Sequence, residues 1–96
     1  MHIQQKQDGS KGSFYIEEEG AILAEMTYSM KGDERIIIDH TEVSDVLRGK
    51  NIGYQLVKTA AEYARANNIK ILPLCPFAKA VMEKRKEEFE DVLRAN

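Results

Sequence analysis

The spacing of apolar residues along this chain changes from strand-like to helix-like at about residue 50. Before that point, three apolar runs alternate with polar residues, as in half-buried strands. They lie at residues 13–18, 21–30 and 35–43. Glu19-Gly20 and residues 31–34 separate the runs and carry the Gly and Asp that short turns use. We therefore predict an antiparallel meander of three strands.

The second half of the chain predicts a βαβ unit and a further helix. Ile52, Leu56 and Ala60 recur at helical intervals, so a helix should run from residue 52 to about 66. A short strand at residues 69–74 should then lie parallel to the third strand. A second helix should begin at Pro76 and end at about Glu88. Its expected outer side consists of Lys79, Glu83, Lys84, Lys86 and Glu87.

These elements define the expected fold class, an α/β (α+β) protein with a mixed sheet. The chain, residues 1–96, reads as one domain. Its polar first eleven residues contribute a short strand through Ile3 or form a loose arm. Pro73 cannot donate to a sheet ladder, so its strand is an edge strand or leaves its neighbour at that point.

Composition removes several classes of function. The 96 residues have a net charge of −2 and 31% charged residues, which gives no strong field toward nucleic acid or membranes. No apolar run has the length of a membrane span or of a signal-peptide core. A single cysteine fits a reducing compartment, and no Cys/His cluster suggests a metal site. We expect a cytoplasmic protein without a bound metal.

Arg48 to Gly53 occupy the turn where a strand gives way to a helix. The first N–H groups of a helix lack intrahelical partners, and the helix dipole adds partial positive charge there. Gly49 and Gly53 carry no Cβ and let a ligand approach the backbone, and Arg48 and Lys50 add two cations. The turn therefore suits a phosphate or pyrophosphate. The alternative is an ordinary strand-to-helix turn whose glycines serve geometry alone.

This turn resembles the acyl-CoA-binding signature of the GNAT superfamily of N-acetyltransferases, Gln/Arg-x-x-Gly-x-Gly/Ala. Arg48 matches the first position and Gly53 the last, while Asn51 stands where the middle Gly is usual. Asn is the non-Gly residue that best tolerates left-handed backbone angles. The resemblance extends from about Phe14 to Val92 and is greatest to very small, single-domain GNAT-like proteins. It implies acetyl-CoA or CoA as co-substrate and, as cofactor-binding residues, Val43, Arg48, Gly49, Lys50, Asn51, Ile52, Gly53, Tyr54 and Phe77.

Cys75 is the most specific candidate for a catalytic residue. It ends a strand just before Pro76, and a thiol at a helix N-terminus should have a lowered pKa. It would lie at the same end of the sheet as the Arg48–Gly53 turn, where it could act as nucleophile or as general acid toward CoA. A small buried packing residue is the alternative. The family's usual Tyr general acid is absent from the second helix.

His40 and Glu42 are the candidate bases, two residues apart on one face of the third strand. Asp39 and Thr41 should face the opposite way. A structural histidine with satisfied hydrogen bonds is the alternative for His40.

The resemblance implies an N-acetyltransferase that acts on an amine acceptor, a small molecule or a protein, with Cys75 assisting. Larger family members carry a pair of acceptor-binding helices after their first strand, but here only Glu19-Gly20 stands at that place. Two alternatives therefore stay open. One is a CoA or acyl-CoA-binding module without turnover, and the other is a small protein-interaction domain. The oligomeric state is also open.

Overall fold

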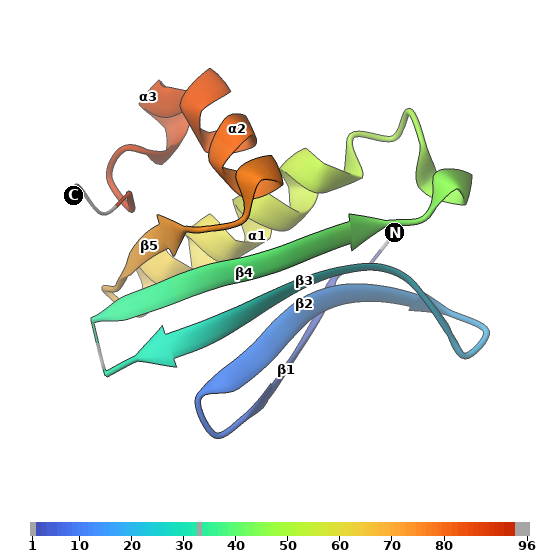
Figure 1. The fold of residues 1–96 in the computed structure, drawn as a ribbon, viewed down its shortest axis with the longest axis horizontal. Coiled ribbons are helices and arrows are strands. Elements are labelled where there is room, and N and C mark those ends of the chain that lie inside the picture. The colour runs from blue at the N-terminus through green and yellow to red at the C-terminus, as the bar shows by residue number, and fades with distance from the viewer. Residues whose placement is uncertain (1, 33, 94–96) are drawn as a thin grey trace.

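A five-stranded sheet forms one layer of the structure, a computed structural model that describes residues 2–32 and 34–93 (Figure 1). The strands follow chain order across the sheet, and their bounds are β1 (Gln4–Asp8), β2 (Lys11–Glu18), β3 (Ala21–Lys31), β4 (Arg35–Val43) and β5 (Lys70–Pro73). Neighbours from β1 to β4 are antiparallel, and β5 is parallel to β4. The predicted mixed α/β fold is confirmed, and the polar N-terminal segment adds the short strand β1.

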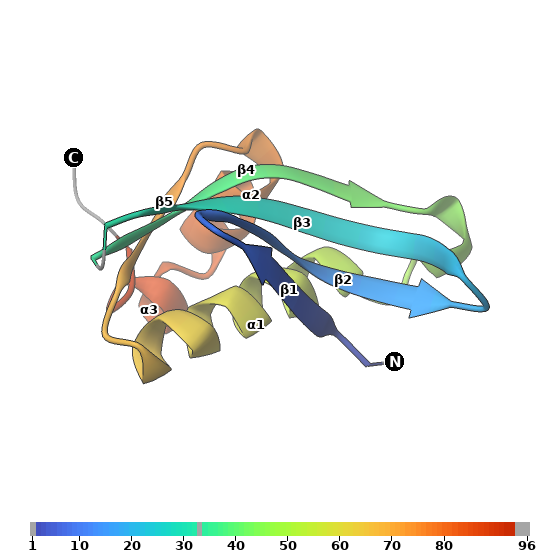
Figure 2. The same ribbon diagram turned by 90° about the horizontal axis from the view of Figure 1, so that it is seen from below.

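Helices cover one face of this sheet. Their bounds are η1 (Asp45–Leu47), α1 (Ile52–Ala66), α2 (Pro76–Lys84) and α3 (Lys86–Phe89). Figure 2 shows α1 lying beneath the sheet, and α1 and α2 pack against each other and against β4 and β5. The β4–α1–β5 unit has the predicted arrangement, and Asn68, two residues after the end of α1, adopts the left-handed conformation at φ 56°.

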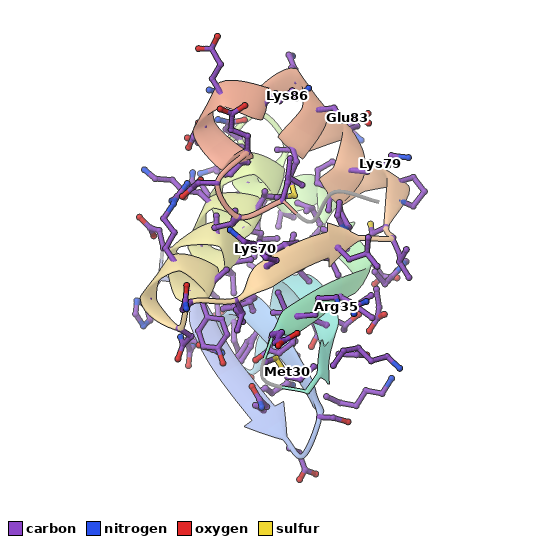
Figure 3. The ribbon with its side chains drawn as sticks, turned by 90° about the vertical axis from the view of Figure 1, so that its left-hand side faces the viewer. Met30, Arg35, Lys70, Lys79, Glu83 and Lys86 are labelled. Atoms are coloured by element: carbon purple, nitrogen blue, oxygen red, sulfur yellow. The ribbon has the colours of Figure 1, made fainter. Side chains whose placement is uncertain are left out.

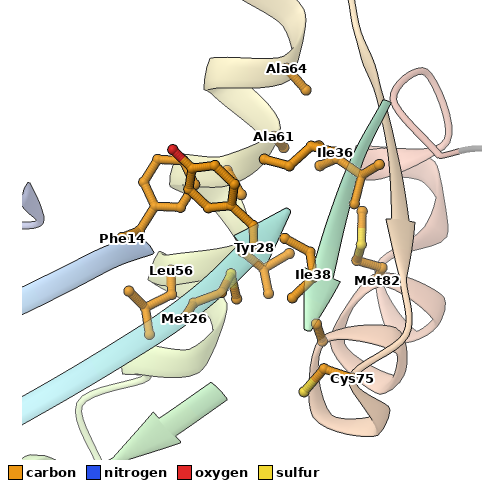
Figure 4. Close-up of a cluster of buried hydrophobic side chains, with 14 of the residues drawn as sticks. Phe14, Met26, Tyr28, Ile36, Ile38, Leu56, Ala61, Ala64, Cys75 and Met82 are labelled. Atoms are coloured by element: carbon orange, nitrogen blue, oxygen red, sulfur yellow. The ribbon is translucent and has the colours of Figure 1, made fainter. Parts of the chain in front are cut away.

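The core fills the space between the sheet and the helices (Figure 4). Phe14, Tyr28 and Tyr63 form a tilted aromatic cluster with ring centroids 5.1–6.4 Å apart. Ala60, Ala61 and Ala64 let α1 approach the sheet closely, and these three residues are buried. Cys75 lies at one end of this core, at the start of α2.

The C-terminal helix is shorter than predicted. Instead of one helix from Pro76 to Glu88, α2 ends at Lys84 and the chain turns at Arg85, at φ −120° and ψ 48°. This turn allows Phe89 to be completely buried, with its ring 6.2 Å from that of Tyr54. Lys79, Glu83 and Lys86 line the outer side of α2 and α3, as predicted (Figure 3).

The end of the described chain is tied to α1 and β5. The Arg65 guanidinium donates to both carboxylate oxygens of Asp91, at 2.6 and 3.0 Å. The N–H of Ile71 donates to the Val92 carbonyl at 2.6 Å, and Leu93 forms a parallel bridge with Ile71. These contacts bury Val92 in the core.

A β-bulge in β4 corrects one prediction. Thr27 pairs with His40 and Tyr28 pairs with Ile38, so Asp39 is the extra residue of β4. Asp39 therefore lies on the face without helices, where its carboxylate accepts a hydrogen bond from Ser29 at 2.7 Å. The expectation that Asp39 shares a face with Thr41 is wrong, because the bulge interrupts the alternation of side chains.

Candidate functional site

Strand β4 continues past the end of β5. Their last residue pair is Ile38 with Pro73, after which the amides of Leu74 and Cys75 both donate to the Ile38 carbonyl at 3.1 Å. Residues 39–43 pair with β3 on one side, and among the described residues no strand pairs with them on the other. We call this side of residues 39–43 the free edge of β4. Pro73 thus lies in an edge strand, at the point where the two strands part.

Val43 directs its backbone groups toward the free edge. The Ser44 N–H donates to the Leu23 carbonyl at 2.7 Å, so the next bonded position along the antiparallel ladder is Glu42, opposite Glu25. Val43, between these two positions, points its N–H and C=O away from β3. A ligand beside β4 could therefore pair with this backbone.

The turn from η1 into α1 is built for close approach to the backbone. Gly49 has φ 82°, and no atom lies within 4 Å of the position that a Cβ would take there. Asn51 adopts the left-handed conformation, at φ 58° and ψ 35°, and caps α1 without a side-chain hydrogen bond. The amides of the first turn of α1 point out at this end of the helix. Asn51 therefore supplies the geometry for which the middle Gly of the signature is usually required.

A groove of about 370 Å³ runs from this turn between α1 and α2. Every predicted cofactor-binding residue except Lys50 lines it. Four further residues also line it, namely Leu47, Val81, Lys84 and Arg85. Sequence reasoning placed Lys84 on the outer side of the second helix, but it lines this groove at the point where α2 ends. The sequence pattern put the end of α2 four residues too late, at about Glu88 rather than at Lys84. A correct end of this helix would have indicated that Lys84 and Arg85 lie beside the groove.

The groove's charges are partly paired within the chain. Arg48 donates to the Asp45 carboxylate at 2.8 Å, and 80% of its side chain remains exposed. The Arg85 guanidinium lies 4.2 Å from the centroid of the Tyr54 ring. The Tyr54 hydroxyl donates to Glu88 at 2.5 Å, and this hydrogen bond to a carboxylate raises the pKa of Tyr54. The pairing of Arg48 is exposed and can be exchanged for a ligand's anion.

Gly53 does not leave its backbone open to a ligand, contrary to the prediction from the sequence. A Cβ built on Gly53 would lie 2.0 Å from the Cζ of Phe77, so the Phe77 ring covers this part of the backbone. Phe77 is 44% exposed and forms part of the wall of the groove. Gly53 therefore admits an aromatic side chain from α2 rather than leaving its own backbone open.

Cys75 caps α2, as predicted, and is 4% exposed. Its Sγ lies 3.5 Å from the Thr41 Oγ1 on the helix-covered face of β4. Burial raises the pKa of the thiol, but the Thr41 hydroxyl and the nearby Ala78 and Phe77 amides outweigh it, so the net pKa is lowered. Sγ makes no capping hydrogen bond of standard geometry, and the amides act through their proximity and orientation.

His40 and Glu42 form a pair on the other face of β4. Their Nε2 and Oε1 atoms are 3.0 Å apart, and both side chains are exposed. Because they oppose Thr27 and Glu25 across the ladder, they lie on the face without helices, whereas Thr41 faces Cys75. The three predicted catalytic side chains are thus on two sides of one strand. Only a ligand that reaches the free edge of β4 could contact both Cys75 and the His40–Glu42 pair.

A second and larger groove, of about 540 Å³, lies beside the first. Both grooves include Val43 in their walls. The second is lined by residues 22–25 and 42–44, including the carboxylates of Glu25 and Glu42. The α1–α2 groove is the smaller of the two, but it has the start of α1 and the cationic side chains in its wall.

Within residues 2–32 and 34–93, no three His, Cys, Asp or Glu side chains gather closely enough to hold a metal ion. In the same part of the chain, no helix has both the length and the apolar character needed to cross a membrane.

The mixed sheet with its β4–α1–β5 unit defines an α/β class of protein, and comparison with known proteins identifies the family. Residues 13–92 match the model of the GCN5-related N-acetyltransferases, and the chain belongs to this family. None of the curated proteins matches the chain significantly.

Solved structures agree with this assignment. A GCN5-like protein of Staphylococcus aureus, itself only proposed to be an N-acetyltransferase, is 40% identical with a TM-score of 0.69, over 97% of this chain and 89% of that one. The ribosomal-protein-alanine N-acetyltransferase of Brucella melitensis biovar Abortus 2308 shares the fold at 20% identity and a TM-score of 0.63, over 93% of this chain and 65% of that one. AAC(6')-Iy, solved with the bisubstrate analogue CoA-S-monomethyl-acetylneamine, shares it at 12% identity and a TM-score of 0.56, over 91% and 67% of the two chains.

Proposed function

We propose that this protein binds acetyl-CoA in the α1–α2 groove and transfers the acetyl group to an amine. The observation that carries the proposal is the convergence of the signature residues on one groove at the start of α1. The open backbone at Gly49 and the left-handed Asn51 fit a pyrophosphate there. The backbone of Val43, directed to the free edge of β4, suits the amides of the pantetheine arm.

Cys75 is proposed as the nucleophile. The lowered pKa of its thiol favours the thiolate, which is the reactive form. The Sγ of Cys75 would attack the acetyl carbonyl carbon, forming a new C–S bond as the bond to the CoA sulfur breaks and CoA leaves as a thiolate. An amine would then attack the acetyl-cysteine, the Cys75 thiolate would leave, and the amine would lose one proton. In direct transfer, Cys75 would instead protonate the departing CoA thiolate.

His40 and Glu42 are proposed to receive the proton of the acceptor amine. Glu42 lines the second groove, which shares Val43 with the cofactor groove, and His40 is paired with Glu42. An amine that enters from the face without helices would meet this pair before it reaches the free edge of β4. The paired Nε2 and Oε1 atoms, 3.0 Å apart, could pass the proton on to solvent.

Binding without turnover is the second candidate function. Glu19 and Gly20 alone connect β2 and β3, so no inserted segment shapes an acceptor pocket at that place. Segment α2 also carries no Tyr as proton donor. These two features favour a CoA-binding module, and the measurement of turnover separates the two functions.

Thermal unfolding with acetyl-CoA, CoA and ATP tests the binding step. A ligand at ~100 times its dissociation constant should stabilise the protein by about 2.7 kcal/mol, a clear shift for a domain of this size. Stabilisation by the CoA species and not by ATP supports the cofactor site, and no shift with any of them contradicts it. Release of the CoA thiol with a panel of amines, together with the intact mass of the protein, then tests transfer and acetylation of Cys75.

A further inference from the structure

We infer that Lys84 and Arg85, at the end of α2, bind the 3′-phosphate of CoA and make the site selective for CoA over its 3′-dephospho form. The inference rests on the proposed function and extends it, because it assigns two residues outside the signature to a separate phosphate. It concerns the wall of the α1–α2 groove opposite the start of α1.

Position is the first argument. The Arg85 guanidinium lies 4.2 Å above the ring of Tyr54, which belongs to the first turn of α1. A pyrophosphate at the Gly49–Asn51 turn would therefore have Arg85 and Lys84 across the groove. CoA carries its remaining phosphate on the ribose, a few bonds beyond the pyrophosphate, so with the pyrophosphate at the turn this phosphate could reach the cations across the groove.

Unused donors are the second argument. The Tyr54 ring holds the guanidinium from one side, and Glu88 approaches it at 4.0 Å, a distance at which an exposed pair contributes little. Among the described residues, no hydrogen bond from the Arg85 side chain is made, and no carboxylate lies within 4 Å of Lys84. A guanidinium has five N–H donors and an ammonium has three, and a phosphate takes both kinds well.

Charge balance is the third argument. At the turn, the helix start and Arg48, whose exposed pair with Asp45 can be exchanged for a ligand's anion, supply the positive charge for the pyrophosphate. A further phosphate bears close to two negative charges and needs cations of its own. Lys84 and Arg85 are the cationic side chains that line the groove apart from Arg48.

A merely structural role for these cations is the rival explanation. Basic residues at the end of a helix interact favourably with its dipole, and this would hold whether or not a ligand binds. Such a role predicts a loss of stability in variants but no discrimination between ligands. Selectivity for the 3′-phosphate therefore separates the two explanations.

The test compares the dissociation constants of CoA and 3′-dephospho-CoA by titration calorimetry. The wild-type protein is expected to prefer CoA by about tenfold or more, as for a charge-assisted contact. The double variant Lys84→Gln/Arg85→Gln should lose this preference through weaker binding of CoA, with the affinity for 3′-dephospho-CoA changing less than about twofold. Lys84→Gln alone, an exposed change that leaves Arg85 on Tyr54, should remove part of the preference.

Lys79→Gln is the matched control, because Lys79 lies on the outer side of α2, away from the groove (Figure 3). It should keep the full preference. A wild-type ratio near one, or equal weakening of both ligands in the double variant, would overturn the inference while leaving CoA binding intact. Failure of every CoA species to bind the wild-type protein would overturn the proposed function as well.

Discussion

The ring of Phe77 lies directly on the backbone of Gly53, so close that a Cβ at residue 53 would come within 2.0 Å of the ring. This contact joins the start of α1 to the start of α2 and sets the width of the groove between them. It gives the last glycine of the signature a packing role. It also places Phe77 where the ring can turn outward, since 44% of Phe77 is exposed.

Gly53→Ala is predicted to weaken acetyl-CoA binding by about tenfold with little loss of stability. The new methyl group must displace the Phe77 ring into the groove, whereas Ala gains roughly 1 kcal/mol over Gly in helix propensity. Calorimetric binding and thermal unfolding of the same sample check the two parts. Restored affinity in Gly53→Ala/Phe77→Ala would identify the ring as the cause, and unchanged affinity in the single variant would contradict the prediction.

Arg48→Glu is predicted to cost about 2 kcal/mol of acetyl-CoA affinity, since it reverses a charge beside the pyrophosphate and breaks the pair with Asp45. The loss should shrink at high salt because Arg48 is exposed. Lys58→Glu, on the exposed side of α1 and outside the groove, is the matched control. Equal affinities for the two folded variants would exclude the phosphate assignment.

Cys75 is predicted to titrate below the ordinary pKa of a free cysteine, and Thr41→Val is predicted to raise its pKa. The chain has one cysteine, so the ultraviolet absorbance of the thiolate reports it alone. Because the folded-state pKa is lowered, the thiolate contributes stability that is fully present above the unfolded-state pKa. This contribution is lost as the pH falls through the folded-state value. An unchanged pKa of Cys75 in Thr41→Val would show that the Thr41 hydroxyl does not lower the pKa of the thiol.

Cys75→Ala is predicted to retain acetyl-CoA affinity within about threefold, because in the proposed mode of binding the thiol meets the thioester and not the phosphates. Turnover should fall by about 100-fold or more if the acetyl group passes through sulfur. Rates with one amine acceptor, measured at saturating acetyl-CoA, check this. Wild-type turnover in this variant would make Cys75 a packing residue.

The bounds of β4 and α1 could be predicted to the residue, because residues 35–43 and 52–66 carry clear periodicity and end at turn residues. The break between α2 and α3 at Arg85 could not be predicted, because no turn residue interrupts the Lys/Glu run in the sequence. The break follows from the burial of Phe89, which is a tertiary contact. The same break explains why Lys84 and Arg85 were missed as groove residues. The side of Asp39 depends on a bulge that forms only when β4 pairs with β3.

In the candidate site, too, local features could be predicted from the sequence, whereas features that depend on strand pairing could not. The signature turn and the N-cap position of Cys75 follow from local sequence and are where they were expected. The separation of Cys75 from His40 and Glu42 follows from the pairing of three strands and was not visible in the chain alone. The roles of these residues, and a cytoplasmic location, stay predictions.

Titration of the ¹⁵N-labelled protein with acetyl-CoA, followed through its amide NMR signals, tests the central claim most directly. We predict saturable shifts at Gly49, Asn51 and Gly53 in the turn and at Val43 on the free edge of β4, with little change in β1. No saturable shifts, or shifts confined to surfaces away from the α1–α2 groove, would contradict the proposal that this groove binds acetyl-CoA.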